Sequence, residues 1–556
     1  MKVALITTSP STHSGIGDYT RHLLPYLREL CEVRAYVEPG AEPGELIDGV
    51  PMAPVTELSP KDHDRVLYQL GNEGHHRFMP GMVRAIGGTV MQHDWVLFDL
   101  ACAAYPGLAR GGLKGHALAL REGGVQQMQR YARNWVDRRS QRVRPIEPED
   151  CDGLPGTLLC GWHESEPKGR WTSDVACFRI PAQGVEEVEV ALHLEGSRSA
   201  RLVEADRPLA TATSAGTLLA RVHEQQAPLL RLETGGITVT RAQREHGDSR
   251  RLGSFVEGVR WRDSSGWTEL DLSEPAAHPL VPVTLSRDRF ELPFNRSVVR
   301  HADSFIVHSK YVANRILADR NTRTPIGILH HGAERRWREE DRREARRRLG
   351  LPEAWVDGFL VVSFGGVQPH KRVDRVLRGV AEARRQRDDI HIVLAGKTHA
   401  GEFDAERYAH ALGLGDAARF TGFVEEQRGW DWMHAGDVCM NLRGPTSGGT
   451  SGGIFQAFSN GRTVIASDAA EQRELPDSCV LKVPVGDGEV DALARTLVEL
   501  RDNPGRRDEL EHATRDFVEA ECHWSVVARQ YAEYLTDFPG PRTTRKAQVA
   551  FGVLWR

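Results

Sequence analysis

The chain has 556 residues, a formal net charge of −5 at pH 7 and eight cysteines. This length suits about two to four domains, each with its own core, and the slightly negative charge argues against a nucleic-acid-binding surface as the main function. The cysteines are scattered without a Cys-x-x-Cys pair, which favours reduced thiols in the cytosol over a disulfide framework or a zinc site.

No apolar run approaches the roughly 18 residues of a membrane-spanning helix. The N-terminal run Val3–Thr8 lacks a basic stretch followed by a long apolar one, so we expect a first strand there and no signal peptide. Further short strands are predicted at Val33–Val37, Val66–Leu70 and Thr89–Gln92. Helical or polar segments separate them, and this alternation predicts a parallel sheet.

A loop with Gly15 and Gly17 joins the first strand to a helix over Tyr19–Leu30. A strand, a glycine loop and a helix open many nucleotide-binding α/β domains. The pair is a weak signal by itself, because the full dinucleotide-binding fingerprint is missing.

Polar residues follow two predicted strands of this region: Asn72, His76, His93 and Asp94. Ligands of open α/β sheets bind beyond the carboxyl ends of the strands, so these four side chains are expected to converge. A structural role is the alternative. The segment 95–145 is predicted to be helical with Arg-rich faces, either solvated or in contact with anionic lipid or a phosphorylated acceptor.

Residues 157–271 change character to short alternating strands and turns, which predicts a β-sandwich. Strands are expected at Val188–Leu194, Leu229–Leu232 and Ile237–Thr240, with sandwich edges at Ser249–Arg251 and Arg260–Arg262. The tryptophans of this region belong either to its core or to a surface that stacks on sugar rings.

The α/β pattern returns after Pro279 with a strand over Ser304–Ser309 and a helix over Lys310–Ala318, so the sandwich is predicted to be inserted into the first α/β domain. A charged linker helix is expected over Arg335–Leu349. A second doubly wound domain follows, with glycines at strand ends (Gly366, Gly396, Gly422), three closing helices (Val490–Arg501, Arg507–Ala520, Trp524–Phe538) and a loosely held tail.

The stretch Pro445–Asp468 reads as a glycine-rich loop, a helix, a turn and a strand. Its glycines would let backbone N–H groups approach a ligand, and Thr450 and Ser451 offer hydroxyls where the helix begins. A helix N-terminus is a natural anion site. The alternative is the loop of an ordinary βα unit.

As a set, these pieces resemble the retaining glycosyltransferases of family four, which have the GT-B fold. The matching motifs are Gly15-Ile-Gly-Asp-Tyr-Thr-Arg-His-Leu-Leu, Gln69-Leu-Gly-Asn with His76, His93-Asp94, Val307-His-Ser-Lys-Tyr, His331-Gly332, Phe364-Gly-Gly with His370-Lys371-Arg372, Gly422-Phe-Val, Asp437 to Arg443, and Pro445 to Glu474-Leu-Pro. The resemblance covers about three quarters of the chain and leaves the β region out.

The resemblance implies two Rossmann-like domains that face a cleft, plus the inserted all-β sandwich. The implied boundaries are 1–150 and 279–345 for the first, acceptor-side domain, 151–278 for the insertion, 346–538 for the nucleotide-sugar-binding domain and 539–556 for the tail. It further implies transfer of a sugar from a nucleotide-sugar donor with retention at the anomeric carbon, without a metal ion or another cofactor.

By this similarity His93 and Lys371 are the predicted catalytic residues; His93 would lie near the sugar, and Lys371 would stabilise the diphosphate. The predicted donor-binding residues are Gly15, Gly17, Gly366, Arg372, Gly396, Lys397, Gly422, Phe423, Thr450, Ser451, Gly452 and Gln456, and the acceptor side is predicted to hold Asn72, His76 and Asp94.

The chain departs from the family pattern at three positions. The family's two glutamates around the glycine loop are replaced by Gly448 and Gln456, and its arginine before the lysine by Gly366. Charge stabilisation would then depend on Lys371, backbone dipoles and Arg443 or Arg372. A non-catalytic carbohydrate- or nucleotide-sugar-binding subunit is therefore one alternative to an active enzyme. Another is a different GT-B-like enzyme, such as an epimerase or a phosphorylase with a pyridoxal-phosphate lysine.

The expected partners are a nucleotide sugar, with GDP-mannose as the guess, and a glycan or lipid-linked glycan acceptor of polysaccharide biosynthesis. Nucleic acid is not expected. A cytoplasmic location follows, with contact at the inner face of the membrane as a further option.

Overall fold

The computed structural model describes residues 1–12, 14–47, 49–137, 156–194, 197–205, 207–237, 252–274, 276, 288–320, 324–398, 403–486 and 488–537. Several predictions fall outside these ranges: the strand residues 238–240, the Arg-rich edge 249–251, the tail 539–556 and the domain boundaries at 150 and 278.

The first α/β domain is built on an eight-stranded sheet in the order β17-β16-β6-β5-β1-β2-β4-β3, in which only the β3–β4 pair is antiparallel. Its first elements are β1 (Lys2–Ile6), α1 (Gly15–Leu27), β2 (Glu32–Val37), β3 (Gly44–Ile47), β4 (Val50–Pro54), β5 (Arg65–Leu70), α2 (Met79–Ile86), β6 (Thr89–Gln92), α3 (Phe98–Ala104), α4 (Gly107–Arg110) and α5 (Gly112–Asp137). The chain returns with α7 (Asp288–Glu291), α8 (Arg296–His301), β16 (Ser304–Val307), α9 (Lys310–Arg320) and β17 (Ile326–Ile328).

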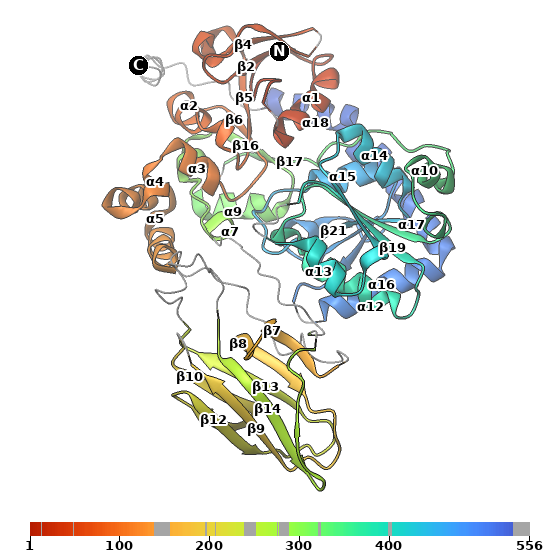
Figure 1. The fold of residues 1–556 in the computed structure, drawn as a ribbon. Coiled ribbons are helices and arrows are strands. Elements are labelled where there is room, and N and C mark those ends of the chain that lie inside the picture. Colours follow the sequence, from red (N-terminus) through yellow and green to blue (C-terminus); the bar gives the residue numbers. More distant parts are fainter. Residues whose placement is uncertain are drawn as a thin grey trace.

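The β-rich domain lies between α5 and α7 in sequence, although β6 and β16 are hydrogen-bonded neighbours in the first sheet. Figure 1 shows it as a separate yellow and green body below the α/β domains. Its strands are β7 (Leu158–Glu166), β8 (Gly169–Arg179), β9 (Glu187–His193), β10 (Ser199–Glu204), β11 (Arg207–Ala212), β12 (Gly216–Arg221), β13 (Leu229–Gly235), β14 (Phe255–Asp263) and β15 (Gly266–Glu269).

These nine strands pair as one continuous antiparallel sheet along the path β11-β10-β13-β8-β14-β9-β12, with β7 on β8 and β15 on β14. The all-β prediction is therefore correct, but the two separate sheets of a sandwich are replaced by a single sheet around one core. Of the tryptophans, Trp162 and Trp261 are buried in that core, as predicted, whereas Trp267 is 42% exposed.

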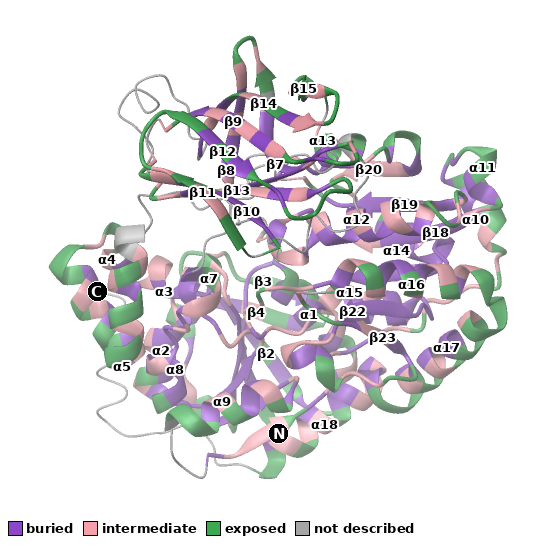
Figure 2. Cartoon of the chain, turned by 90° about the horizontal axis from the view of Figure 1, so that it is seen from below, coloured by how far each residue is buried: buried purple, intermediate pink, exposed green. Residues whose placement is uncertain are grey.

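The second α/β domain has a six-stranded parallel sheet in the order β20-β19-β18-β21-β22-β23. Its elements are α10 (Arg342–Arg348), α11 (Glu353–Val356), β18 (Phe359–Phe364), α12 (Val373–Arg384), β19 (Ile390–Ala395), α13 (Ala405–Ala411), β20 (Ala418–Gly422), α14 (Glu426–Ala435), β21 (Val438–Asn441), α15 (Gly452–Ser459), β22 (Val464–Ser467), β23 (Val480–Val483), α16 (Glu489–Asp502), α17 (Pro504–Phe517) and α18 (Trp524–Asp537). The central strands of both α/β domains are buried, among them every residue of β6, β19, β21 and β22, while the edge strands β3, β17 and β20 are partly exposed (Figure 2). Two sheets of mainly parallel strands with helices between them confirm the predicted fold class.

The predicted linker helix over Arg335–Leu349 is wrong in extent. The helix α10 begins only at Arg342, because the carboxylate of Asp341 accepts a hydrogen bond from Arg343 N and caps it. One of its charged residues is part of the core of the second domain, since Arg346 is buried and its guanidinium pairs with Asp437 at 2.6 Å. The prediction of reduced thiols is wrong for one cysteine, because Cys160 is disulfide-bonded; Cys31, Cys439, Cys479 and Cys522 have free thiols.

The helix α18 packs on the first domain, although the sequence assigned all of 346–538 to the second. Its apolar residues Trp524, Val527 and Leu535 share a core with Leu5 and Leu23 of the first domain. The physical reason is that α1 leaves an apolar face that the first domain does not cover by itself. A buried hydrogen bond of 2.9 Å between the Tyr19 and Tyr531 hydroxyls joins α1 to α18.

We expect Tyr531→Phe to destabilise the protein by about 1 kcal/mol, because the Tyr19 hydroxyl loses its partner in an apolar core. Urea unfolding measures the change. The double variant Tyr19→Phe/Tyr531→Phe removes both hydroxyls and should recover part of the loss; additive losses would show that the two hydroxyls do not interact.

Candidate active site between the two α/β domains

The glycine-rich loop before α15 docks directly on the first domain. Ser447 Oγ donates to Asp94 Oδ1 at 2.8 Å, and Val96 N donates to Ser447 O at 2.8 Å. A Cβ atom on Gly449 would lie 2.1 Å from Asp94 Oδ1, and one on Gly448, whose φ is +78°, would lie 2.7 Å from Trp95 Cβ. The sequence assigned these glycines to a ligand, but in this structure they allow the two domains to touch.

Two further contacts tie the domains together near this loop. The carboxylate of Glu474, after β22, accepts hydrogen bonds from Lys310 N and Tyr311 N at 2.7 and 2.6 Å and so caps the N-terminus of α9. His22 on α1 lies 3.1 Å from Glu426 on α14.

Lys371 lies at the carboxyl end of β18 beside Arg443, which follows β21. Gly365 makes room for it, since a Cβ there would lie 2.7 Å from Lys371 Nζ. Dehydration by the surrounding protein, and then the charge of Arg443, lower the pKa of Lys371 to about 7. The charged neighbour that shifts the pKa of Lys371 is therefore another cation, Arg443.

Arg443 connects the cationic group to the helix. Its Nη2 donates to Ser451 Oγ at 2.8 Å, and Ser451 is the N-cap of α15. The carboxyl edge of the second sheet thus brings together a lysine, an arginine and a helix N-terminus. Each of these groups favours a bound anion. Dehydration, together with Arg443 and Lys371, also lowers the pKa of His370 to about 3, so that this imidazole stays neutral.

Glu471 is a site residue that the sequence reasoning missed. It lies in the short helical turn after β22, is 5% exposed, and its Oε1 accepts a 2.9 Å hydrogen bond from Thr446 Oγ1. The same Thr446 oxygen accepts from Gly448 N at 3.0 Å. Burial raises the pKa of Glu471 to about 7 although Arg443 lowers it, and its Oε2 is buried without a hydrogen-bond partner.

A carboxylate therefore lies next to the loop position where the family glutamate is replaced by Gly448. It comes from a different element, so no spacing rule around the glycine loop could have found it. The only available signal was an acidic residue shortly after a strand whose carboxyl end faces the site.

His93 lies among aromatic rings next to the loop, packed edge-to-face against Tyr19 and tilted against His308. Its Nε2 donates to Gln69 Oε1 at 2.8 Å, and its ring lies 4.6 Å from that of Tyr19 and 5.4 Å from that of His308. Burial, with smaller contributions from His308 and His331, holds the pKa of His93 well below its usual range. The imidazole is therefore neutral.

The predicted convergence of the acceptor-side residues is observed. Asn72 N donates to Asp94 Oδ2 at 3.0 Å, while the Asn72 side chain contacts Asp99 at the start of α3. His76 is buried, and its Nδ1 lies 3.1 Å from Gly71 N. Burial raises the pKa of Asp94.

The predicted donor-binding residues divide into groups. Gly15, Gly452 and Gln456 line one cavity of about 240 Å³ between the domains, together with His331, Glu334 and Glu426. The other residues at the strand ends are Gly366, Gly396, Lys397, Gly422 and Phe423, of which Phe423 is 76% exposed. Thr450 is half-buried in the loop before α15.

Gly17 and Arg372 are engaged by the protein itself. A Cβ on Gly17 would lie 2.9 Å from Thr8 Oγ1, so this glycine serves the packing of α1. Arg372 is buried, and its Nε and Nη2 donate to the two carboxylate oxygens of Glu489. This pairing favours a structural role for Arg372 over contact with a donor.

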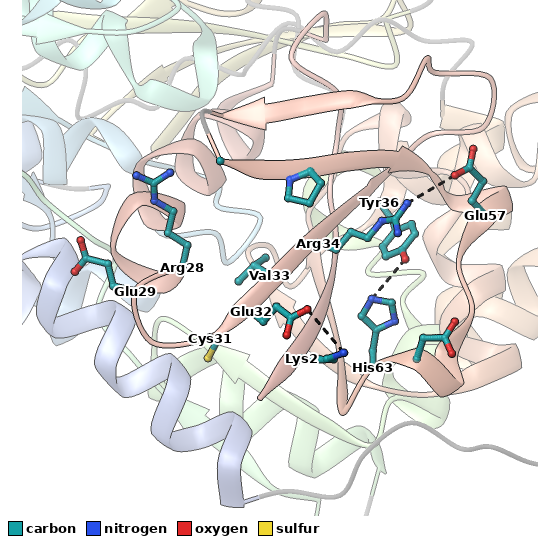
Figure 3. A pocket seen from close by; sticks show the side chains of 13 residues that line it. Lys2, Arg28, Glu29, Cys31, Glu32, Val33, Arg34, Tyr36, Glu57 and His63 are labelled. Atoms are coloured by element: carbon teal, nitrogen blue, oxygen red, sulfur yellow. Dashed lines mark hydrogen bonds and ion pairs between the residues drawn. The ribbon is translucent and has the colours of Figure 1, made fainter.

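A second cavity, of about 770 Å³, lies at the opposite edge of the first sheet (Figure 3). Lys2 pairs with Glu32, Arg34 with Glu57, and Tyr36 with His63. Because the cavity lies at the amino ends of β1 and β2, away from the strand ends where ligands of open α/β sheets bind, it is not the candidate site. Within the described ranges there is no cluster of three or more His, Cys, Asp or Glu residues able to hold a metal ion.

Comparison with known proteins identifies the second domain. Residues 358–503 match the family of glycosyl transferases group 1. The chain is 27% identical over 289 residues to a D-inositol 3-phosphate glycosyltransferase of Streptomyces avermitilis, covering 48% of this chain and 56% of the relative. It is 24% identical over 205 residues to a GDP-mannose-dependent monoacylated alpha-(1-6)-phosphatidylinositol monomannoside mannosyltransferase of Corynebacterium glutamicum, covering 36% and 52%.

The chain thus spans about half the length of these relatives. Among solved structures, the sucrose-phosphate synthase of Thermosynechococcus elongatus aligns over 96% of this chain and 98% of its own, with 12% identity and a TM-score of 0.49. Two doubly wound domains with their strand ends facing one another form the GT-B fold class predicted from the group 1 glycosyl transferase motifs. The described part of the chain contains no helix long and apolar enough to cross a membrane.

We expect Gly448→Ala to cost more stability than Gly413→Ala. Both positions have positive φ, +78° and +73°, but only at Gly448 does the new methyl group meet a neighbour, Trp95. The difference in free energy of unfolding should be about 1 to 3 kcal/mol, the usual range for overpacking. Urea unfolding of the two variants measures it, and equal losses would contradict the domain contact.

We expect Glu471→Gln to remove a pH dependence of stability. A buried carboxyl whose folded pKa is about 7, against 4.5 ordinarily, stabilises the fold at low pH and loses that contribution as pH rises through 7. Between pH 5 and pH 8 the free energy of unfolding of the variant should rise relative to that of the wild type, by up to about 3 kcal/mol. Unfolding at both pH values tests this, with exposed Glu406→Gln as the control that should gain nothing.

Proposed function

We propose that this protein is a metal-independent retaining hexosyltransferase. It would move a sugar from a nucleoside-diphosphate sugar to a glycan or glycolipid acceptor, as a step of polysaccharide or glycolipid biosynthesis. The observation that carries this proposal is the cationic group at the start of α15, where Lys371 and Arg443 meet a helix N-terminus and Lys371 has a cation as its charged neighbour. The match of residues 358–503 to the group 1 glycosyl transferases supports the same chemistry.

The chemical need of such a transfer fits these groups. When the bond between the anomeric carbon and the diphosphate oxygen breaks, the electron pair stays on the diphosphate. The new bond forms between the anomeric carbon and the acceptor hydroxyl oxygen, and the hydroxyl proton passes to the departing diphosphate oxygen. Lys371, Arg443 and the first N–H groups of α15 would stabilise the developing negative charge. A dianionic ligand would also raise the pKa of Lys371 and keep it protonated.

The remaining roles follow from position. The 240 Å³ cavity with Gly15, Gly452 and Gln456 would hold part of the nucleotide, and Phe423 with the β19 and β20 ends would border the base. His93, Asp94 and Asn72 would face the sugar and the acceptor. GDP-mannose is the first donor to test, and a cytoplasmic location with access to the inner membrane face is part of the proposal.

The second candidate function is a binding subunit without turnover. Gly448 offers no side chain, and Gln456 carries no charge where the resemblance places glutamates. The position of Glu471 argues against a binding subunit. Its carboxyl group is linked to Gly448 through Thr446, although Glu471 comes from a different element than the family glutamate.

Turnover of a panel of nucleotide sugars, measured as released nucleoside diphosphate, tests the proposal. We expect Lys371→Ala to lower turnover by at least about a hundredfold, as for loss of a group that stabilises transition-state charge. The exposed Lys168→Ala in the β-rich domain is the matched control. Binding of a nucleotide sugar by the wild type without any turnover would establish the binding subunit instead.

The affinity for a nucleotide sugar should fall as the pH rises above about 7, because free Lys371 loses its proton there while the bound form keeps it. The expected slope approaches tenfold per pH unit. The diphosphate diester of the donor does not titrate between pH 6.5 and 8.5, and calorimetric titrations of the wild type and Lys371→Ala in this range separate the lysine from Glu471, whose pKa is also about 7. In Lys371→Ala the slope should vanish; an unchanged slope would assign it to another group.

A further inference from the structure

The helices α4 and α5 expose an apolar surface to solvent. Leu113 is 92% exposed, Val125 58% and Leu120 44%. Among the described residues, no other helix or strand exposes more than one large apolar side chain to this degree. Both helices carry green, exposed stretches in Figure 2 and lie at the outer edge of the first domain in Figure 1.

The backbone of α5 is not helical at Gly124, so the helix has two parts. In the first part Leu113, Ala117 and Leu120 are spaced by four and three residues, which places them on one side, while Val125 follows the kink. The opposite side of the first part is buried, where Ala119 packs with Leu108 in a small core that Tyr131 joins from beyond the kink. The helix is thus held firmly by the domain while it presents leucines outward.

The charges around this face have one sign. Residues 107–134 contain five cations, all exposed, and a single acid; the cations are Arg110, Lys114, Arg121, Arg130 and Arg133. The acid, Glu122, is 1% exposed and its carboxylate is occupied by Arg121 and the Ser297 hydroxyl. The surface that solvent meets is therefore apolar and positive, although the whole chain is negative.

We propose that this face of α4 and α5, the basic apolar face, docks on a bilayer that contains anionic lipid. Leucines would enter the headgroup boundary while the cations meet lipid phosphates, the combination that interfacial helices use. A second copy of the chain is disfavoured as the occupant, because a symmetric contact would bring the five cations against themselves. Nucleic acid would match the charges but leave the leucines without an apolar partner.

The basic apolar face is connected to the candidate active site. The core behind it contains Val96 and Phe98, and Trp95 packs against the same core, directly after His93 and Asp94 in the chain. Docking would therefore hold the acceptor side of the site near the lipid surface, which suits an acceptor carried by a lipid. This last step rests on the proposed function, whereas docking itself does not.

Sedimentation of the full chain with lipid vesicles tests the docking. We expect binding to vesicles of phosphatidylglycerol mixed with phosphatidylcholine, weak binding to phosphatidylcholine alone, and a loss of binding as salt is raised. Leu113→Ser/Leu120→Ser and Arg110→Gln/Lys114→Gln should each lower the partition coefficient by at least about tenfold, since one cation alone is worth roughly fivefold. The exposed Leu219→Ser, in the β-rich domain, should bind like the wild type.

Wild-type protein that stays in the supernatant with anionic vesicles would overturn the proposal, and so would apolar-face variants that sediment like the wild type. Light scattering adds a further outcome: a dimer that the double serine variant converts to monomer would assign the face to a second copy. Release of nucleoside diphosphate in the absence of lipid reports on the proposed function separately. Turnover without vesicle binding would reject only the docking, and vesicle binding without turnover only the transfer reaction.

Discussion

The close approach of the loop 447–449 to residues 93–96 is the constraint on which the candidate active site depends. Backbone of one domain meets backbone and a carboxylate of the other at distances that leave no room for a Cβ atom at Gly449. This contact fixes how the carboxyl ends of the two sheets face each other. The residues that follow β6, β18, β21 and β22 are thereby gathered around one point.

Burial at that point acts on cations and carboxyl groups in opposite directions. Burial lowers the pKa of Lys371 to about 7 and raises the pKa of Glu471 to about 7. Both groups therefore change between charged and neutral forms near neutral pH. Arg443 influences both of them. A site of this kind can take up the charge of a ligand by moving protons within the protein, and it needs no permanent counter-ion for its lysine.

Contacts distant from the site support the same geometry. The helix α18, at the end of the described chain, packs on α1, and Glu474 of the second domain caps α9 of the first. Each contact joins segments more than 150 residues apart in sequence. The core next to the basic apolar face also includes residues that directly follow His93 and Asp94, so the surface and the site are joined through one packed core.

The sequence by itself determined the class of the fold and most of its strands, because apolar runs, turn residues and helical spacing act locally. The family resemblance pointed to Lys371, His93 and the glycine loop, and the structure places all three beyond the carboxyl ends of strands near the domain contact. The tertiary structure decided what local patterns do not encode: that Gly448 and Gly449 serve a domain contact, that Arg372 is held by Glu489, that α18 belongs to the first core, and that Glu471 approaches the loop at Gly448 through Thr446. Each of these depends on which segments meet across long sequence separations, and pairing of that kind follows from packing and dehydration in the folded chain.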